Sequence, residues 1–395
     1  MQRKGKESMK RFFKLLATAV CAMAMVFALA ACSSGTDDAS KGDDTAKTEE
    51  SGKGLSIVII SSSGIDDGSF TQNVYEGIES FVKDHSDCTV TDVKESDMDK
   101  LIPTVESLVA DYDVFVLPGF NFAAIGDIAA ANPDKYFIVV DSTITDSEGN
   151  AMSLDNVYTM TFREQESGFY AGVAAALETK TGKVAVVNGM AFPSNVNYQK
   201  GFESGVNYSN KHYGTDAELI EIASYAGQDV AGNDIGGNYV GGFGDEAGGK
   251  VVGQALIDQG VDVMLVAAGA SGNGVFTAAK ENPNIFVIGC DTDQYDDGAN
   301  GDSNIILTSA LKVMDINVDR VLNEIYDGNF KGADDVLGAD TQSTGIELED
   351  GRHQLSPETI EKLQEVKGLV ESGEIVPAAD VTVNEYSPED FPGLN

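Results

Sequence analysis

Short runs of β-branched and other apolar residues alternate with helical patterns along most of this 395-residue chain. Each run has the length of a buried strand, and Ile57–Ile60 is apolar at every position, as is typical of a parallel strand covered on both faces. Strands that alternate with helices predict a doubly wound α/β fold. The predicted strands are Leu55–Ser61, Asp113–Leu117, Tyr136–Asp141, Lys183–Asn188, Val261–Ala268, Ile285–Cys290 and Asn304–Ser309, and the predicted helices between them include Phe70–Lys83, Glu164–Thr179, Val196–Tyr208 and Val251–Gln259.

The globular part of the chain is too long for a single hydrophobic core, so two lobes are expected. We predict that residues 55–162 and 291–330 form lobe 1, and that residues 163–290 and 331–395 form lobe 2. A last helix is predicted near the C-terminus, with Ser356 as N-cap and Pro357 at the first helical position.

The N-terminus has the order of a secretion signal, because six basic residues precede an apolar stretch that ends at Ala31. The sequence Leu29-Ala30-Ala31-Cys32 resembles the lipobox of bacterial lipoproteins, so residues 1–31 are predicted to be a signal peptide and Cys32 a lipidation site. The alternative, an uncleaved membrane helix, is disfavoured because about 17 apolar residues are at the short limit for spanning. The polar segment 32–54 is predicted to be a flexible tether to the extracytoplasmic face of the membrane.

Composition excludes several classes of function. A formal net charge of −38 repels nucleic acid and argues against a phosphorylated ligand. Four cysteines, two of them before residue 33, do not make a disulfide framework. Three histidines without ligand-like spacing to the cysteines do not suggest a metal site, and no cofactor is expected.

Polar and aromatic side chains follow several predicted strands. Open parallel sheets bind ligands at the carboxyl ends of their strands. Asp141 and Asp291 stand at two such ends, Asp293 follows closely, and Lys312 lies just after the last strand. Carboxylates accept hydrogen bonds from a sugar diol, and a lysine donates to a ring oxygen or nitrogen. Any of these aspartates could instead cap the next helix, and for Asp293 the two interpretations are equally weighted.

Phe70 and Phe243 are the candidate stacking residues beside this polar cluster, although Phe70 could instead pack the start of its helix against the sheet. Asp67 and Thr71, close to Phe70, and Gly269, at another strand end, complete the candidate ligand contacts. No catalytic constellation is present, since Ser271 has no evident base beside it. The segment 244–250 has the glycine and lysine spacing of a phosphate loop but lacks the Ser or Thr after its lysine.

Several motifs follow one another in the order found in the basic membrane protein family, and this chain resembles that family from Leu55 to Pro377. They are Asp67-Gly68-Ser69-Phe70, Phe162-Arg163-Glu164-Gln165-Glu166, Ala171-Gly172, Gly201-Phe202 and Ile288-Gly289 with Asp291. The resemblance implies a type I periplasmic-binding-protein fold and, as in characterised members, capture of purine nucleosides for an ABC importer. It also implies that Phe70 and Phe243 stack on the ligand, Asp141 and Asp291 bind ribose hydroxyls, Lys312 completes the sugar pocket, and Gly269 allows close backbone contact.

Two departures from the family pattern lie near the expected base. The family often has Asn after the stacking Phe and Asp after the first strand, where this chain has Thr71 and Ser61–Ser63. We therefore predict an exported lipoprotein that binds a nucleoside as a monomer in a cleft between two hinged, Rossmann-like lobes and delivers it to an ABC permease. The alternatives are a receptor for another polar solute, such as a sugar, and a nucleoside-processing enzyme.

Overall fold

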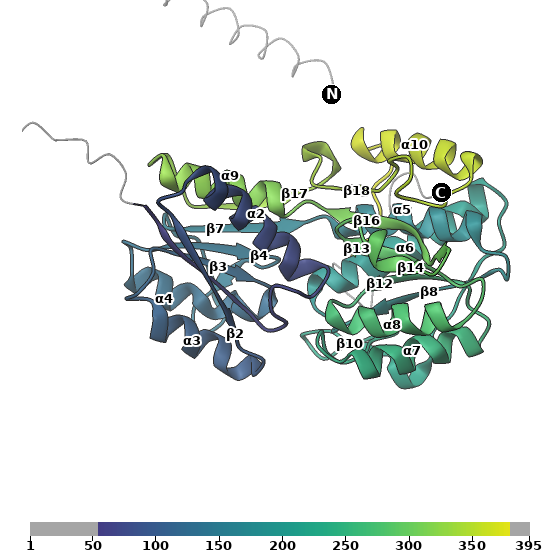
Figure 1. Ribbon diagram of the computed structural model, residues 1–395, viewed down its shortest axis with the longest axis horizontal. Helices are drawn as coiled ribbons and strands as arrows, with labels where there is room; N and C mark the ends of the chain where they lie inside the picture. Colours follow the sequence, from purple (N-terminus) through teal and green to yellow (C-terminus); the bar gives the residue numbers. More distant parts are fainter. Residues whose placement is uncertain (1–53, 380–395) are drawn as a thin grey trace, which may run out of the picture. The chain divides into compact units, whose positions relative to one another are not determined.

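Residues 54–379 of the computed structural model are described, and they form two lobes, each built on one six-stranded sheet (Figure 1). The predicted signal peptide, the tether and Cys32 lie outside the described residues. All seven predicted strands and all the predicted helices are present. The C-terminal helix begins as predicted, because the Ser356 hydroxyl accepts a hydrogen bond from the Thr359 amide and Pro357 opens the helix.

The sheet of lobe 1 is parallel throughout, and helices cover both faces. The strands, in spatial order, are β17 (Ala333–Leu337), β7 (Val157–Phe162), β4 (Tyr136–Val140), β3 (Val114–Pro118), β1 (Ser56–Ser61) and β2 (Thr89–Lys94). Ile57 and Ile59 pack against α2 (Phe70–Asp84) and α9 (Asp315–Tyr326), whereas Val58 and Ile60 pack against α3 (Leu101–Leu108) and α4 (Gly126–Ala131). The continuous apolar run of β1 is therefore explained by burial on both sides.

The sheet of lobe 2 has a corresponding order and one antiparallel edge strand. Its strands are β18 (Thr344–Ile346), β16 (Ile306–Lys312), β13 (Phe286–Asp291), β12 (Val263–Ala267), β8 (Lys183–Asn188) and β9 (Glu218–Leu219), of which β18 is antiparallel to β16. One face is covered by α7 (Glu246–Asp258) and α8 (Ala270–Glu281), the other by α5 (Glu164–Glu178), α6 (Pro193–His212) and α10 (Pro357–Glu371).

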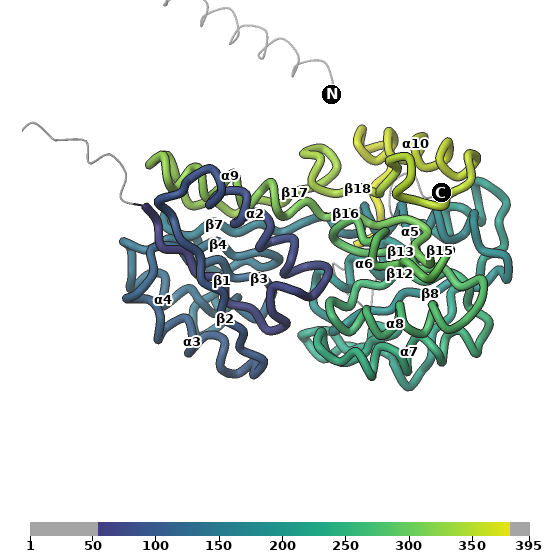
Figure 2. The backbone as a smooth tube through the Cα atoms, in the orientation of Figure 1, coloured from purple at the N-terminus to yellow at the C-terminus, as the bar shows by residue number. Residues whose placement is uncertain are grey.

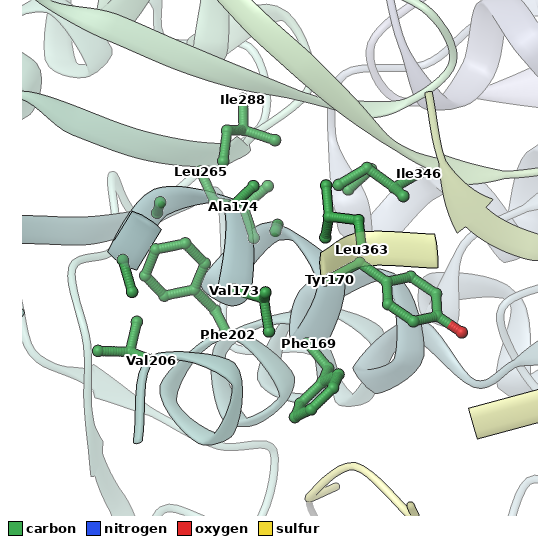
Figure 3. Close-up of a cluster of buried hydrophobic side chains, with 14 of the residues drawn as sticks. Phe169, Tyr170, Val173, Ala174, Phe202, Val206, Leu265, Ile288, Ile346 and Leu363 are labelled. Carbon is green, nitrogen blue, oxygen red and sulfur yellow. The ribbon is translucent and has the colours of Figure 1, made fainter. Parts of the chain in front are cut away.

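The largest core lies under α5 and α6, where Phe169, Phe202 and Val206 meet Leu265 and Ile288 of the sheet (Figure 3). These two helices pack backbone to backbone, because glycines face the neighbouring helix. A Cβ at Gly172 would lie 2.2 Å from the Phe202 carbonyl oxygen, and one at Gly205 would lie 2.2 Å from the Phe169 carbonyl oxygen. The glycines of the motifs in this region thus serve close helix packing.

Short elements complete the described chain. They are the hairpins β5 (Ile144–Thr145) with β6 (Ala151–Met152), β10 (Gly227–Gln228) with β11 (Asp234–Gly236) and β14 (Ala299–Asn300) with β15 (Ser303–Asn304), and the 3-10 turns Met98–Lys100, Phe120–Ile125, Ala223–Tyr225, Asp296–Gly298 and Ala339–Thr341.

The chain crosses between the sheets three times, after β7, after β16 and after β17, as the tube in Figure 2 traces. These crossings correct the predicted lobe boundaries. Residues 306–312, assigned to lobe 1, pair with β13 in lobe 2, and residues 333–337, assigned to lobe 2, pair with β7 in lobe 1. The strand β17 escaped prediction because this edge strand, Ala333–Leu337, contains two aspartates and only one fully buried side chain.

Candidate ligand-binding site

A cavity with about 630 Å³ of space between atoms, part of it open to solvent, lies where the carboxyl ends of strands from both sheets meet. The structure brings all eight predicted ligand contacts to its wall, namely Asp67, Phe70, Thr71, Asp141, Phe243, Gly269, Asp291 and Lys312. Residues up to 245 positions apart, several of them predicted from their place at strand ends, therefore share one cavity wall.

Lys312 forms the centre of the polar end of the cavity. Its Nζ lies 2.6 Å from Asp141 Oδ2 and 3.5 Å from Asp291 Oδ1, and all three side chains are almost completely buried. Although burial opposes it, the nearby carboxylates raise the pKa of Lys312, so the lysine is charged. Burial raises the pKa of the Asp141 carboxyl, and the charge of Lys312 opposes that shift.

Both aspartates offer hydrogen-bond acceptors. Asp141 Oδ1 is buried and has no hydrogen-bond partner among the described residues. Asp291 is oriented by the Ser69 hydroxyl, which donates to Oδ2 at 2.9 Å, and by the Tyr198 hydroxyl, which donates to Oδ1 at 3.1 Å. A carboxylate oxygen accepts more than one bond, so ligand hydroxyls can still bind at both residues.

Glu164 is a third carboxylate in this cluster that the sequence interpretation did not assign to the site. It is the first residue of α5, its Oε1 lies 3.7 Å from Lys312 Nζ, and Asn197 donates to its Oε2 at 3.0 Å. Burial, reinforced by the charge of Asp141, raises its pKa to about 8. Its position two residues after strand β7 could have identified Glu164 as a site residue, but β7 was not among the predicted strands.

Aromatic rings line the rest of the cavity. Phe70 faces the lysine, with its ring centroid 4.7 Å from Lys312 Nζ, and Phe243 lies 5.8 Å from Phe192, which in turn lies 5.5 Å from Phe120. Phe120 and Phe192 were not predicted, although both follow strand ends as Phe70 does.

Gly269 lies beside Phe243, since a Cβ at Gly269 would lie 3.4 Å from the Phe243 Cβ, in ordinary van der Waals contact. Its φ of 53° is in the left-handed region. A side chain at this position would therefore strain the backbone.

The carboxylate of Asp67 is occupied by its own loop. It accepts hydrogen bonds from the amides of Ser69, Thr71 and Gln72 and from the Ser63 hydroxyl, all between 3.0 and 3.1 Å. These bonds satisfy the free amides at the start of α2. Asp67 therefore orders this loop.

Asp293 does not line the cavity. Its side chain accepts a hydrogen bond from the Tyr295 amide at 2.9 Å and pairs with Arg352. Of the two interpretations open for this residue, its contacts support the capping role.

The chain was compared with known protein families, curated proteins and solved structures. A match to the family described as Bmp, ABC transporter substrate-binding protein PnrA-like, spans residues 55–378. A CD4+ T-cell-stimulating antigen of Listeria innocua is 30% identical over 387 residues, which cover 93% of this chain and 98% of that protein. The ABC transporter nucleoside-binding protein BmpA of Lactococcus lactis subsp. cremoris is 29% identical over 352 residues, which cover 85% of this chain and 91% of that protein.

Solved structures agree on the fold. An ABC transporter system solute-binding protein from Aeropyrum pernix K1 has a TM-score of 0.67 at 24% identity and covers 82% of this chain and 92% of its own. The predicted fold class, a two-lobed α/β solute-binding protein, is therefore confirmed. Within residues 54–379, no helix is both long enough and apolar enough to cross a membrane.

Proposed function

The chain belongs to the Bmp family of PnrA-like ABC transporter substrate-binding proteins, and from this membership we propose that it captures a purine nucleoside and holds it in the cavity between its two sheets. The family consists of solute-binding proteins, which serve the permease of an ABC transporter outside the cytoplasm. The observation that carries the proposal is the pairing of two buried carboxylates at one end of the cavity with aromatic rings along its walls.

The polar end suits a ribose. Asp141 Oδ1 has no partner among the described residues, and Asp291 is held close by, so the two carboxylates can accept hydrogen bonds from neighbouring hydroxyl groups. Bonds from a hydroxyl to an ionised carboxylate are about twice as strong as those between neutral groups. Lys312 neutralises part of the negative charge, which makes the end suitable for a neutral ligand.

The aromatic walls suit a flat heterocycle. Phe70, Phe243 and Phe192 offer ring faces at which a base can stack, and stacking on aromatic side chains contributes about 1–3 kcal/mol per base. A sugar could also pack against Phe70 but has less need of a second ring, so the additional rings favour a nucleoside.

A thermal-shift screen of the purified protein against nucleosides, free bases and sugars tests this proposal. A ligand that binds only the folded state raises the melting temperature by mass action. We expect nucleosides to raise it more than matched free bases or pentoses, and the nucleoside to be recovered chemically unchanged. A shift with sugars alone would show a different solute receptor, and turnover of the nucleoside would show an enzyme.

We further propose that the protein is a monomer anchored to the membrane through lipidated Cys32. Several acyl chains on one residue give the stable attachment that one chain does not. Expression of the full chain in a bacterium should place it in the membrane fraction with lipid label incorporated, and Cys32→Ser should abolish the label. Label retained by that variant would contradict the anchor.

A further inference from the structure

Three side chains of the cavity wall, Thr71, Ser63 and Asp67, are linked in one hydrogen-bonded chain, and this part of the wall is called the Thr71–Ser63 end. The Thr71 and Ser63 hydroxyl oxygens are 3.0 Å apart, and the Ser63 hydroxyl donates to Asp67 Oδ2 at 3.0 Å. All three residues line the cavity, and Thr71 and Asp67 are each only 2% exposed. Thr71 is therefore in direct contact with Ser63, which belongs to the segment Ser61–Ser63 described above as a departure from the family pattern.

The direction of this chain of hydrogen bonds is set by the carboxylate. Asp67 can only accept, and a bond to a charged acceptor is stronger than one to a neutral hydroxyl, so the single proton of Ser63 points to Asp67. Ser63 must then accept from Thr71, whose proton points to Ser63. Three backbone amides hold the Asp67 carboxylate in place, which keeps this orientation from reversing.

Both hydroxyl protons are thus used within this chain of hydrogen bonds, so these two hydroxyls can offer a ligand only their lone pairs. Two further donors on the wall are occupied, because Asn195 Nδ2 donates to the Ala267 carbonyl at 2.8 Å and the Tyr198 hydroxyl donates to Asp291. The Thr71–Ser63 end therefore offers acceptors and has an electronegative carboxylate behind it.

We propose that Thr71 and Ser63 are specificity-determining residues that select ligands presenting an N–H donor at this end of the cavity. The inference rests on the proposed function and adds to it the class of base edge that is recognised. A base with an amino or ring N–H group there gains a hydrogen bond, whereas a base with only acceptor nitrogens brings lone pairs against lone pairs. Sites built around one hydrogen bond reject analogues that lack it, because a buried group is left unpaired.

Calorimetric titration of the purified protein with matched ligand pairs tests the proposal. Adenosine and purine riboside differ by the 6-amino group, guanosine and inosine by the 2-amino group, and inosine and 1-methylinosine by the ring N–H. For at least one pair, we expect the wild-type protein to bind the donor-bearing member about tenfold more tightly or better. Thr71→Val, which keeps the shape and removes the hydroxyl, should reduce that ratio to about threefold or less, and Thr71→Ser should restore it.

Ser63→Ala supplies a second readout that a purely structural role would not produce. Without Ser63 as acceptor, the Thr71 hydroxyl is free to donate into the cavity, so the donor-deficient member of the pair should bind more tightly than it does to the wild type. The proposal is overturned if no pair is discriminated by the wild-type protein, or if the ratio is unchanged in both Thr71→Val and Ser63→Ala. Absence of binding by every nucleoside would instead overturn the proposed function itself.

Discussion

Asp141 and Asp291 occupy equivalent positions in the two lobes. Each ends or follows a strand that is third in its sheet, β4 in lobe 1 and β13 in lobe 2, and each has a left-handed backbone, with φ of 62° and 68°. Their carboxylates approach the same ammonium group, Lys312 Nζ, at 2.6 and 3.5 Å. Aspartate tolerates this conformation better than most residues, so the repeated geometry aims two acceptors into one cavity.

Replacement of Asp291 by Asn tests its assignment to the ribose end. Loss of the charged acceptor should weaken nucleoside binding about 10- to 100-fold, since hydrogen bonds to charged groups contribute about 1.5–3 kcal/mol. Asp293→Asn is the matched control, because Asp293 lies two residues away and pairs with Arg352 outside the cavity. Calorimetry measures nucleoside binding by both variants. Equal affinities of Asp291→Asn and Asp293→Asn would refute the assignment of Asp291 to the ribose end.

Lys312 is expected to be essential for stability as well as for the site. Lys312→Met leaves the buried carboxylates of Asp141 and Asp291 without their cation, and breaking a buried ion pair in this way costs about 3–5 kcal/mol. Urea unfolding at pH 7 should show this loss. Lys100→Met, at an exposed pair, is the control, and similar midpoints for the two variants would contradict the expectation.

Glu164 should make the protein less stable as the pH rises. Its pKa is about 8 in the folded protein against an ordinary value of 4.5, so between these values the folded state holds a proton that the unfolded chain has released. The free energy of unfolding then falls with pH, by at most about 1.4 kcal/mol per pH unit for this group, and levels off above about pH 8.

Glu164→Gln has no titrating group at this position. Its free energy of unfolding should therefore decline less than that of the wild type between pH 5 and pH 8. Urea unfolding at several pH values measures both profiles, with Glu79→Gln on the surface of α2 as control. If the free energy of unfolding fell equally with pH in Glu164→Gln and in the wild type, the raised pKa of Glu164 would be ruled out.

Two glycine substitutions should have opposite effects on stability, because Gly172 faces the backbone of a neighbouring helix and Gly368 does not. Gly172→Ala places a methyl group 2.2 Å from the Phe202 carbonyl oxygen and should destabilise the protein by about 1–3 kcal/mol. Gly368→Ala, in α10 with no atom within 4 Å of the new methyl, should stabilise it by about 0.5–1 kcal/mol through helix propensity. Thermal unfolding measures both, and a tolerated Gly172→Ala would mean that the helices can separate at little cost.

The sequence by itself determined the elements and much of the site wall. Strand runs, helix periodicity and the Ser356 cap are decided by interactions within a few residues, so they could be recognised without a structure. The strand-end rule then identified Asp141, Asp291, Gly269 and Lys312 of one cavity, because every parallel strand presents its carboxyl end to the same edge of its sheet.

Only the tertiary structure decided the partners of these elements and side chains. Which sheet accepts β16 or β17 depends on pairing between distant segments, and a short polar edge strand carries little local signal. The ion pair of Asp141 with Lys312 spans 171 positions, and the addition of Glu164 to it follows from burial and charge in three dimensions. Likewise, the amides at the start of α2 and Ser63 occupy Asp67, which the sequence had offered to the ligand, because hydrogen-bond competition is settled only when the loop is folded.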